Sequence, residues 1–138
     1  MKNSFDNNNR EECLHIAVDE GNFDEVKNLL QSGYSLDAFD DLDYTPFHYA
    51  CKNEDYEMMD MLLENGANIN AYNESKIGET PLGLVAATCS FELARYLIDK
   101  GADPTIKGWM QITALNTASK RKKAEGKRVY ELLMRSCK

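Results

Sequence analysis

The residues of this sequence best suited to chemistry are its two histidines, His15 and His48. An imidazole can act as a general base near neutral pH or bind a metal ion. Catalysis would also need a recognisable partner motif, such as Gly-x-Ser-x-Gly, His-Glu-x-x-His or a phosphate-binding loop. The sequence contains none of these motifs. We therefore expect no catalytic residue, no metal site and no cofactor.

The four cysteines are the second set of chemical candidates, because cysteine pairs bind zinc or carry redox chemistry. They are widely spaced and include no Cys-x-x-Cys pair. Residues 1–10 are rich in asparagine and lack the apolar core of a signal peptide, and no apolar stretch reaches the roughly 18 residues of a membrane helix. These features predict a cytoplasmic protein with reduced thiols.

Length and composition predict one folded domain. The chain has 138 residues, of which 43% are apolar and 28% are charged. Its net charge of −7 is unevenly distributed, because residues 1–74 carry 17 acidic and 4 basic side chains and residues 75–138 carry 6 acidic and 12 basic ones. The two segments have net charges of −13 and +6, and such an asymmetry steers charged partners.

A repeat of about 33 residues positions these side chains. Leu14-His15-Ile16-Ala17 recurs 33 residues later as Phe47-His48-Tyr49-Ala50. The pair Leu29-Leu30 with Gly33 recurs as Leu62-Leu63 with Gly66, and then as Leu97-Ile98 with Gly101. Thr45-Pro46 recurs as Thr80-Pro81, and Thr113-Ala114-Leu115 follows Thr80-Pro81-Leu82 by 33. The chain therefore contains about four copies, and a repeat of this length predicts a solenoid or an array.

Each copy predicts a pair of helices. A threonine followed by proline is an N-cap followed by the first helical position. Residues 56–64 place apolar side chains at helical spacing, and the glycines after the second helices can adopt a left-handed conformation. The predicted core consists of Leu14, Ala17, Val26, Leu29, Leu30, Ala50, Met59, Leu62, Leu63, Leu82, Leu84, Leu93, Leu97 and Ile98.

At these residues the chain resembles the ankyrin-repeat family, whose signature is Thr-Pro-Leu-His-x-Ala followed by Leu-Leu-x-x-Gly-Ala-Asp/Asn-x-Asn. The second copy matches best, with Thr45-Pro46-Phe47-His48-Tyr49-Ala50 and Leu62-Leu63-Glu64-Asn65-Gly66-Ala67-Asn68-Ile69-Asn70. The third copy has Gly83 and the fourth has Asn116 in place of the histidine, and the first copy has Glu12-Cys13 in place of Thr-Pro. The first and fourth copies resemble capping repeats.

The resemblance implies an all-α solenoid of helix-turn-helix units joined by projecting β-hairpin loops. One ankyrin-repeat domain would cover residues 11–138, with repeats at about 11–40, 41–73, 74–107 and 108–138, and residues 1–10 would be disordered or poorly ordered. The resemblance also implies that His15 and His48 form hydrogen bonds between neighbouring repeats. Asn70 matches the asparagine that cellular hydroxylases modify in family members.

The resemblance places binding on the hairpin tips and the exposed ends of the first helices. The positions that the repeat leaves free there are our candidate partner-binding residues: Phe39, Asp41, Leu42, Tyr44, Lys52, Asn53, Tyr72, Glu74, Lys76, Ile77, Glu79, Trp109 and Met110. Aromatic anchors ringed by charged residues are typical of binding hot spots. The alternative for each aromatic residue is that it packs against a neighbouring hairpin or caps the core.

Two charged runs have competing interpretations. The run Asp37, Asp40, Asp41 and Asp43 can be a solvated face or a contact for a basic partner, and its spacing does not match a calcium loop. The run Lys120 to Lys123, with Lys127 and Arg128, can be a nucleic-acid patch, a localisation signal or a basic cap at the end of the fold. It lacks interleaved aromatic residues, and the acidic half of the chain would repel phosphates.

We therefore expect a non-catalytic protein-protein interaction module that binds a folded partner with a basic surface, as an inhibitor, an antitoxin-like protein or an adaptor. The chain is expected to be monomeric alone, and no small-molecule substrate, membrane or nucleic acid is expected as a partner. The alternative is a nucleic-acid-associated protein that uses the basic C-terminal segment.

Overall fold

The computed structural model describes residues 12–74 and 78–137. The chain divides into two compact units, with the boundary between Asn68 and Ile69. The predicted poorly ordered segment, residues 1–10, lies outside the described residues, as do Lys76 and Ile77. The predicted repeat boundaries, and the assignment of residues 11–138 to one domain, stay predictions.

The first unit consists of two helix pairs in series. The pairs are a helix over residues 12–19 with α2 (Phe23–Gln31), and α3 (Pro46–Lys52) with α4 (Tyr56–Glu64). The second helix of each pair begins at an Asx cap: the side chain of Asn22 accepts a hydrogen bond from the Glu25 N–H, and that of Asp55 accepts one from the Met58 N–H. Helices α3 and α4 pack on each other. Residues 56–64 therefore form the predicted helix.

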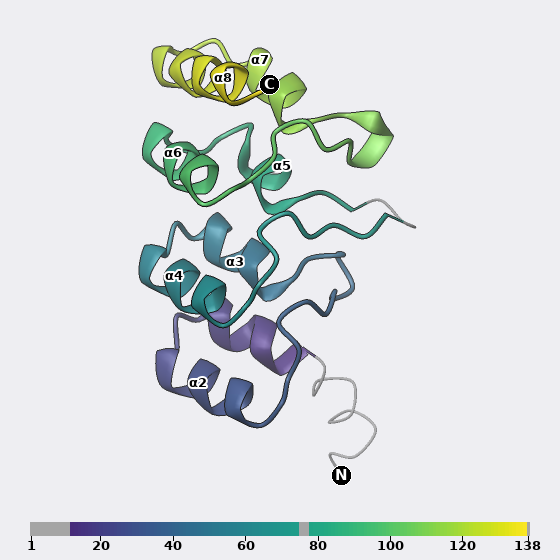
Figure 1. The fold of residues 1–138 in the computed structure, drawn as a ribbon, viewed down its shortest axis with the longest axis vertical. Helices are drawn as coiled ribbons and strands as arrows, with labels where there is room; N and C mark the ends of the chain where they lie inside the picture. The colour runs from purple at the N-terminus through teal and green to yellow at the C-terminus, as the bar shows by residue number, and fades with distance from the viewer. Residues whose placement is uncertain (1–11, 75–77, 138) are drawn as a thin grey trace. The chain divides into compact units, whose positions relative to one another are not determined.

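The second unit repeats this arrangement. It contains α5 (Pro81–Val85), α6 (Phe91–Asp99), a short 3₁₀ turn η1 (Trp109–Gln111), α7 (Ala114–Ser119) and α8 (Ala124–Ser136). The two first helices, α5 and α7, pack on each other, and so do the two second helices, α6 and α8 (Figure 1). The predicted helix-turn-helix units are therefore confirmed.

The first helices begin with three versions of one cap. Thr45 and His48 form a reciprocal capping box, in which the Thr45 N–H donates to Nδ1 of His48 at 2.9 Å. Thr113 and Asn116 form the same box, with Oδ1 of Asn116 accepting from the Thr113 N–H at 3.1 Å. In α5 only half of the box remains, because Gly83 has no side chain to return the bond to Thr80.

Glycine follows α2, α4 and α6 at the predicted positions. Gly33, Gly66 and Gly101 have φ angles of 93°, 98° and 105°. In this left-handed region glycine avoids the steric cost of a Cβ atom.

The core follows the predicted pattern with one correction. Leu14, Val26, Met59, Leu82 and Leu93 are buried, as are five other predicted core residues. In the pairs of α2, α4 and α6 the second residue is only half-buried, and so is Leu84: the four are Leu30, Leu63, Leu84 and Ile98. A neighbour in sequence lies about 100° around a helix, so the second residue of a pair is on the flank of the buried face. Sequence analysis did not assign the buried residues Val18, Met58, Val129 and Leu133 to the core.

Loops, and not strands, connect the helix pairs in the described part of the chain. The loop between α2 and α3 is closed by a hydrogen bond from the Asp40 N–H to the Tyr44 carbonyl, at 2.9 Å. The loop between α6 and α7 is closed by one from the Gly108 N–H to the Ile112 carbonyl, also at 2.9 Å. In these two loops the two arms are therefore joined by a backbone hydrogen bond, and no strand is assigned in residues 12–74 and 78–137. The all-α class is confirmed.

Candidate protein-binding surface

Both histidines serve the fold. His15 is buried, and its Nε2–H donates to the carbonyls of Ala38 and Tyr44, at 2.9 and 3.0 Å, in the loop that leads into α3. The predicted bond from one repeat to the next is therefore confirmed for His15. His48 is fully buried and caps α3. These contacts hold the two imidazoles inside the first unit.

The loop of the first unit is organised by Asp40. One carboxylate oxygen accepts hydrogen bonds from the Leu42 and Tyr44 N–H groups, both at 3.0 Å, and the other accepts one from the Tyr49 hydroxyl. Asp43 has a φ of 63°, which completes the turn. The result is a loop tip that holds Leu42 outward, with 63% of its surface exposed.

An aromatic cluster supports this loop. The Tyr44 ring is stacked on His48, with centroids 5.2 Å apart, and lies edge-on to Tyr49 at 5.5 Å. Nζ of Lys52 lies 5.8 Å and 5.5 Å from the centroids of the two tyrosine rings. Burial raises the pKa of Tyr49 well above its ordinary value of 10.0, and the hydrogen bond to Asp40 and its negative charge raise that pKa further. Tyr44 therefore packs within the unit, as our alternative for the aromatic residues predicted.

Other candidates of the first unit face solvent. Phe39 is 37% exposed, and Asp41 and Lys52 are exposed at the loop and at the end of α3. Asn53 is exposed too, and its amide donates to Oδ1 of Asp19 at 3.0 Å. This unit therefore presents an apolar loop tip beside exposed carboxylates.

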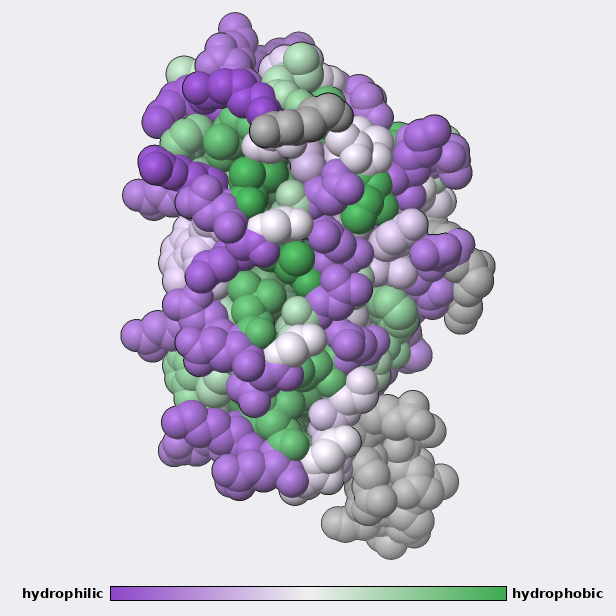
Figure 2. Space-filling view, in the orientation of Figure 1, coloured by the Kyte–Doolittle hydropathy of each residue, from purple (hydrophilic) through white to green (hydrophobic). Residues whose placement is uncertain are grey.

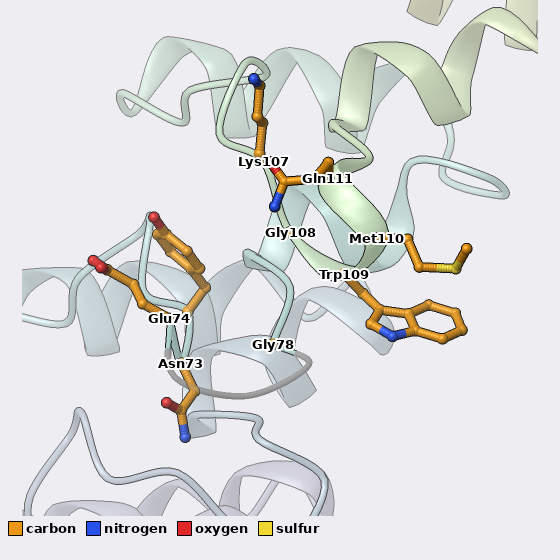
Figure 3. A pocket seen from close by; sticks show the side chains of 9 residues that line it. Asn73, Glu74, Gly78, Lys107, Gly108, Trp109, Met110 and Gln111 are labelled. Carbon is orange, nitrogen blue, oxygen red and sulfur yellow. The ribbon is translucent and has the colours of Figure 1, made fainter.

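In the second unit, residues of two loops line one hollow of about 330 Å³ (Figure 3). Four candidates, Tyr72, Glu74, Trp109 and Met110, are among its lining residues, together with Asn73, Gly78, Lys107, Gly108 and Gln111. Glu74 lies on one side of the hollow, and Trp109 and Met110 lie on the other (Figure 3). Most of the lining is polar, so the hollow is suited to a polar group beside the exposed Trp109 and Met110.

Glycine lies at two close backbone approaches beside this hollow. A Cβ atom on Gly108 would lie 3.1 Å from the Gly78 carbonyl oxygen, which is a tight contact between the two loops. A Cβ atom on Gly78 would lie 2.5 Å from the Asn73 backbone nitrogen, within the first of the two loops. A side chain at Gly78 would therefore force this loop to move.

The Trp109 loop is fixed by an unusual backbone. Met110 and Gln111 have φ angles of 57° and 63°, and these are successive left-handed residues that are not glycine. The Gln111 and Ile112 N–H groups donate to the carbonyls of Gly108 and Trp109, at 3.0 and 3.1 Å. Trp109 is 49% exposed and Met110 is 68% exposed. Such strained conformations cluster at functional sites.

Glu79 lies beside this hollow in a separate narrow slot. The slot is lined by Thr80, Gly83, Gly108 and Thr113, among others, and holds about 10 Å³, near the space of one water molecule. Burial raises the pKa of the Glu79 carboxyl from its ordinary value of 4.5. Glu79 therefore belongs to the packing between the loops more than to an open surface.

The basic C-terminal run is partly used for packing within the second unit. Nη1 of Arg121 donates to the carbonyls of Cys89 and Ala86, at 2.8 and 3.4 Å, at the turn between α5 and α6. Arg128 lies over the Phe91 ring, 4.1 Å from its centroid. Two of the six cations of the run, Arg121 and Arg128, therefore make contacts within the second unit.

The surface that faces the viewer in Figure 2 is mostly polar, with apolar side chains visible between the polar ones. No helix within residues 12–74 and 78–137 is long and apolar enough to cross a membrane. In the same residues, no group of three His, Cys, Asp or Glu side chains is arranged to hold a metal ion.

The candidate residues fall into two groups, one in each unit, and Lys76 and Ile77 lie outside the described residues. Sequence analysis did not single out Tyr49, Gln111 or the exposed Ile16. Tyr49 and Ile16 share the variable position between histidine and alanine in the signature, and an apolar residue there in successive repeats was the signal available. Nothing in the sequence around Gln111 indicated its backbone conformation.

Comparison with known proteins agrees with this architecture. A family model described as ankyrin repeats (3 copies) matches residues 1–73, and one described as ankyrin repeats (many copies) matches residues 54–98. The chain is 38% identical over 89 residues to ankyrin repeat and SOCS box protein 9 of Homo sapiens, which is 64% of this chain and 24% of that protein.

Two further relatives have similar identities. An ankyrin repeat-containing protein of Schizosaccharomyces pombe is 37% identical over 68% of this chain, and the B-cell lymphoma 3 protein homolog of Mus musculus is 34% identical over 80% of it. The matched region spans 44% and 24% of these two proteins, which is less than half of each. The chain belongs to the ankyrin-repeat family, because the first family model alone covers more than half of it.

Proposed function

We propose that this chain binds a folded partner protein through its loop tips and acts in the cytoplasm without catalysis, as an inhibitor, an antitoxin-like protein or an adaptor. Repeat proteins of this kind use the surfaces that stacking leaves free for binding. The observation that carries the proposal is the pair Trp109 and Met110, two large exposed side chains on a loop with a fixed backbone.

A preformed anchor favours binding, because little conformational entropy is lost when the partner arrives. Trp109 is held by the hydrogen bonds of its loop, and the hollow beside it accepts a polar group of the partner. Leu42 provides a second exposed tip in the first unit, on a loop that Asp40 fixes. Aromatic residues and methionine are enriched at the centres of protein interfaces.

The charge of the first unit supports a partner with a basic surface. Residues 12–68 contain 14 acidic side chains and two basic ones, Lys27 and Lys52. Opposite charges raise association rates and exclude partners of the wrong sign. Binding that weakens with rising salt concentration is therefore expected.

The test is affinity capture from the source organism with three forms of the chain: wild type, the double variant Trp109→Ala/Met110→Ala, and Met134→Ala. Met134 is 47% exposed on α8 and lies outside the hollow, so it is the matched control. A stoichiometric partner that the double variant loses and the control keeps supports the proposal. A partner retained equally by all three forms refutes the site.

Trp109 also provides a direct signal, because it is the only tryptophan of the chain. Its emission should shift to shorter wavelength when the captured partner buries the indole. An unchanged emission maximum in a saturated complex would place the contact elsewhere.

A further inference from the structure

A cation already lies on two tyrosine rings of the first unit. Nζ of Lys52, at the end of α3, is 5.8 Å from the centroid of the Tyr44 ring and 5.5 Å from that of the Tyr49 ring. Both distances are within the roughly 6 Å at which the face of an aromatic ring attracts a positive charge. The two rings are inclined at 74° to each other, and both are half-buried, while Lys52 is exposed. The tyrosine pair, Tyr44 and Tyr49, is therefore a cation site that a lysine of the chain itself occupies.

The chain holds the tyrosine pair in place before any partner binds. His48 is stacked on one face of the Tyr44 ring, with 11° between the planes, so a ligand can reach only the other face. His15 lies edge-on to the Tyr49 ring at 6.1 Å, and the Tyr49 hydroxyl donates to Oδ2 of Asp40. Because these contacts fix both rings, a ligand that binds them loses little free energy to ordering the site.

The charges around the tyrosine pair favour a cation. Burial raises the pKa of Tyr49 most, and the hydrogen bond to Asp40 and the negative charges of Asp40 and Asp19 raise it further. Asp19 is held by Asn53, whose amide donates to its Oδ1 at 3.0 Å. Residues 12–68 contain 14 acidic side chains and two basic ones, of which one is the lysine on the rings. This excess of negative charge attracts a positively charged ligand to the site.

An arginine side chain suits the tyrosine pair better than Lys52 does. At an exposed position, the contact of a cation with one ring is worth roughly a two- to fivefold change in affinity, so Lys52 is held weakly. An ammonium group is compact and strongly hydrated, whereas a guanidinium is planar and more weakly hydrated. The guanidinium also stacks on aromatic faces and pairs with carboxylates through its fork of donors. A partner's arginine can therefore replace the lysine.

We propose that the tyrosine pair binds an arginine side chain of the partner protein, and that this arginine displaces Lys52. The inference rests on the proposed function, because it takes from there a partner with a basic surface. It names the residue that this partner presents to the first unit, at a site separate from Trp109. Lys52 is then an internal competitor, which lowers the affinity for partners that have no arginine at this position.

The test is an NMR titration of the full-length chain with a blocked Gly-Gly-Arg-Gly-Gly peptide. The control peptide carries citrulline in place of arginine, which has nearly the same shape but no charge. In the free chain, the ring currents of Tyr44 and Tyr49 should shift the Cε protons of Lys52 upfield. The arginine peptide should return these signals towards their ordinary position and should move its own Cδ protons upfield. The citrulline peptide should do neither at the same concentration.

Lys52→Ala and Lys27→Ala form a matched pair of variants. Each removes one of the two positive charges of residues 12–68, but only Lys52 lies on the tyrosine pair. The general attraction between the acidic unit and a basic peptide therefore increases in both variants. Lys52→Ala also removes the competitor, so it should bind the arginine peptide roughly fivefold more tightly than Lys27→Ala does. Circular dichroism establishes that both variants are folded.

Three results would overturn the proposal. The first is that the arginine and citrulline peptides shift the same signals equally. The second is equal affinity of Lys52→Ala and Lys27→Ala for the arginine peptide. The third is that the Lys52 signals stay upfield when the peptide is saturating. None of these results depends on whether Trp109→Ala/Met110→Ala loses its partner, so the two proposals fail separately.

Discussion

Gly126 lies inside α8, where replacement by alanine normally stabilises a helix by about 1 kcal/mol. Here we expect the opposite sign. A Cβ atom at Gly126 would lie 2.4 Å from Cβ of Arg121, 2.6 Å from its Nε and 3.0 Å from its Cδ. These separations are far below van der Waals contact, so the Arg121 side chain and its backbone must move.

The cost follows from what Arg121 holds. Its guanidinium donates to the Cys89 carbonyl at 2.8 Å and to the Ala86 carbonyl at 3.4 Å. A hydrogen bond from a charged group contributes roughly 1.5–3 kcal/mol, and the longer bond contributes little. The displaced backbone adds a further cost, and the higher helix propensity of alanine offsets about 1 kcal/mol. Gly126→Ala should therefore lower the free energy of unfolding by about 1–3 kcal/mol.

Urea denaturation followed by circular dichroism at 222 nm measures this loss. Gly83→Ala is the control, because the new Cβ would lie 3.2 Å from Oγ1 of Thr80 and would displace no guanidinium, so its effect should be smaller. In an Arg121→Gly background the obstructing side chain is absent, and Gly126→Ala should then stabilise the chain by about 1 kcal/mol. The reasoning is refuted if Gly126→Ala stabilises the wild-type chain, or changes stability equally in both backgrounds.

Three further substitutions test other contacts. Asn70→Ala removes a side chain that forms hydrogen bonds with two backbone groups of the next loop, the Gly101 carbonyl and the Asp103 N–H. It should lower the free energy of unfolding, measured in urea, by about 1–3 kcal/mol. An unchanged urea midpoint would show that these two bonds contribute nothing to stability. Because the pKa of Tyr49 is raised in the folded state, the stability of the fold should decrease as the pH rises above 10.0. Asp40→Asn removes the neighbouring negative charge and should lower the pH at which Tyr49 ionises in an ultraviolet titration. Ionisation of Tyr49 at the same pH in both proteins would contradict this. Burial disfavours the charged form of the Glu79 carboxyl, and Gln carries no charge at any pH. Glu79→Gln should therefore raise the thermal midpoint more at pH 7 than at pH 4. An equal shift at both pH values would exclude a desolvation penalty at Glu79.

Local sequence predicted the elements of this fold well, because each is specified within a few residues. Thr45-Pro46 predicted the start of α3, and Gly66 predicted the end of α4. A hydroxyl cap, a proline at the first helical position and a left-handed glycine act through their immediate neighbours. The register of the repeat could therefore be counted directly from the residues.

The candidate surface was predicted less completely, because its side chains are positioned by contacts distant in sequence. The position of Tyr44 in the repeat predicted an exposed aromatic side chain, but in the structure Tyr44 packs on His48 and Tyr49. Arg121 belongs to a basic run, yet it contacts a turn more than 30 residues earlier. Trp109 was predicted as a binding residue because no position of the repeat motif calls for a large apolar side chain there.

The half-cap at Thr80 has a consequence for how the second unit opens. Helix α5 has five residues, the fewest of the described α-helices, and one of them is glycine, which favours the unfolded chain. Segments with few internal bonds open locally at a lower free energy than the domain as a whole. We therefore expect fraying of this unit to start at α5, with the amide protons of Leu84 and Val85 exchanging with deuterium before those inside α6 and α8.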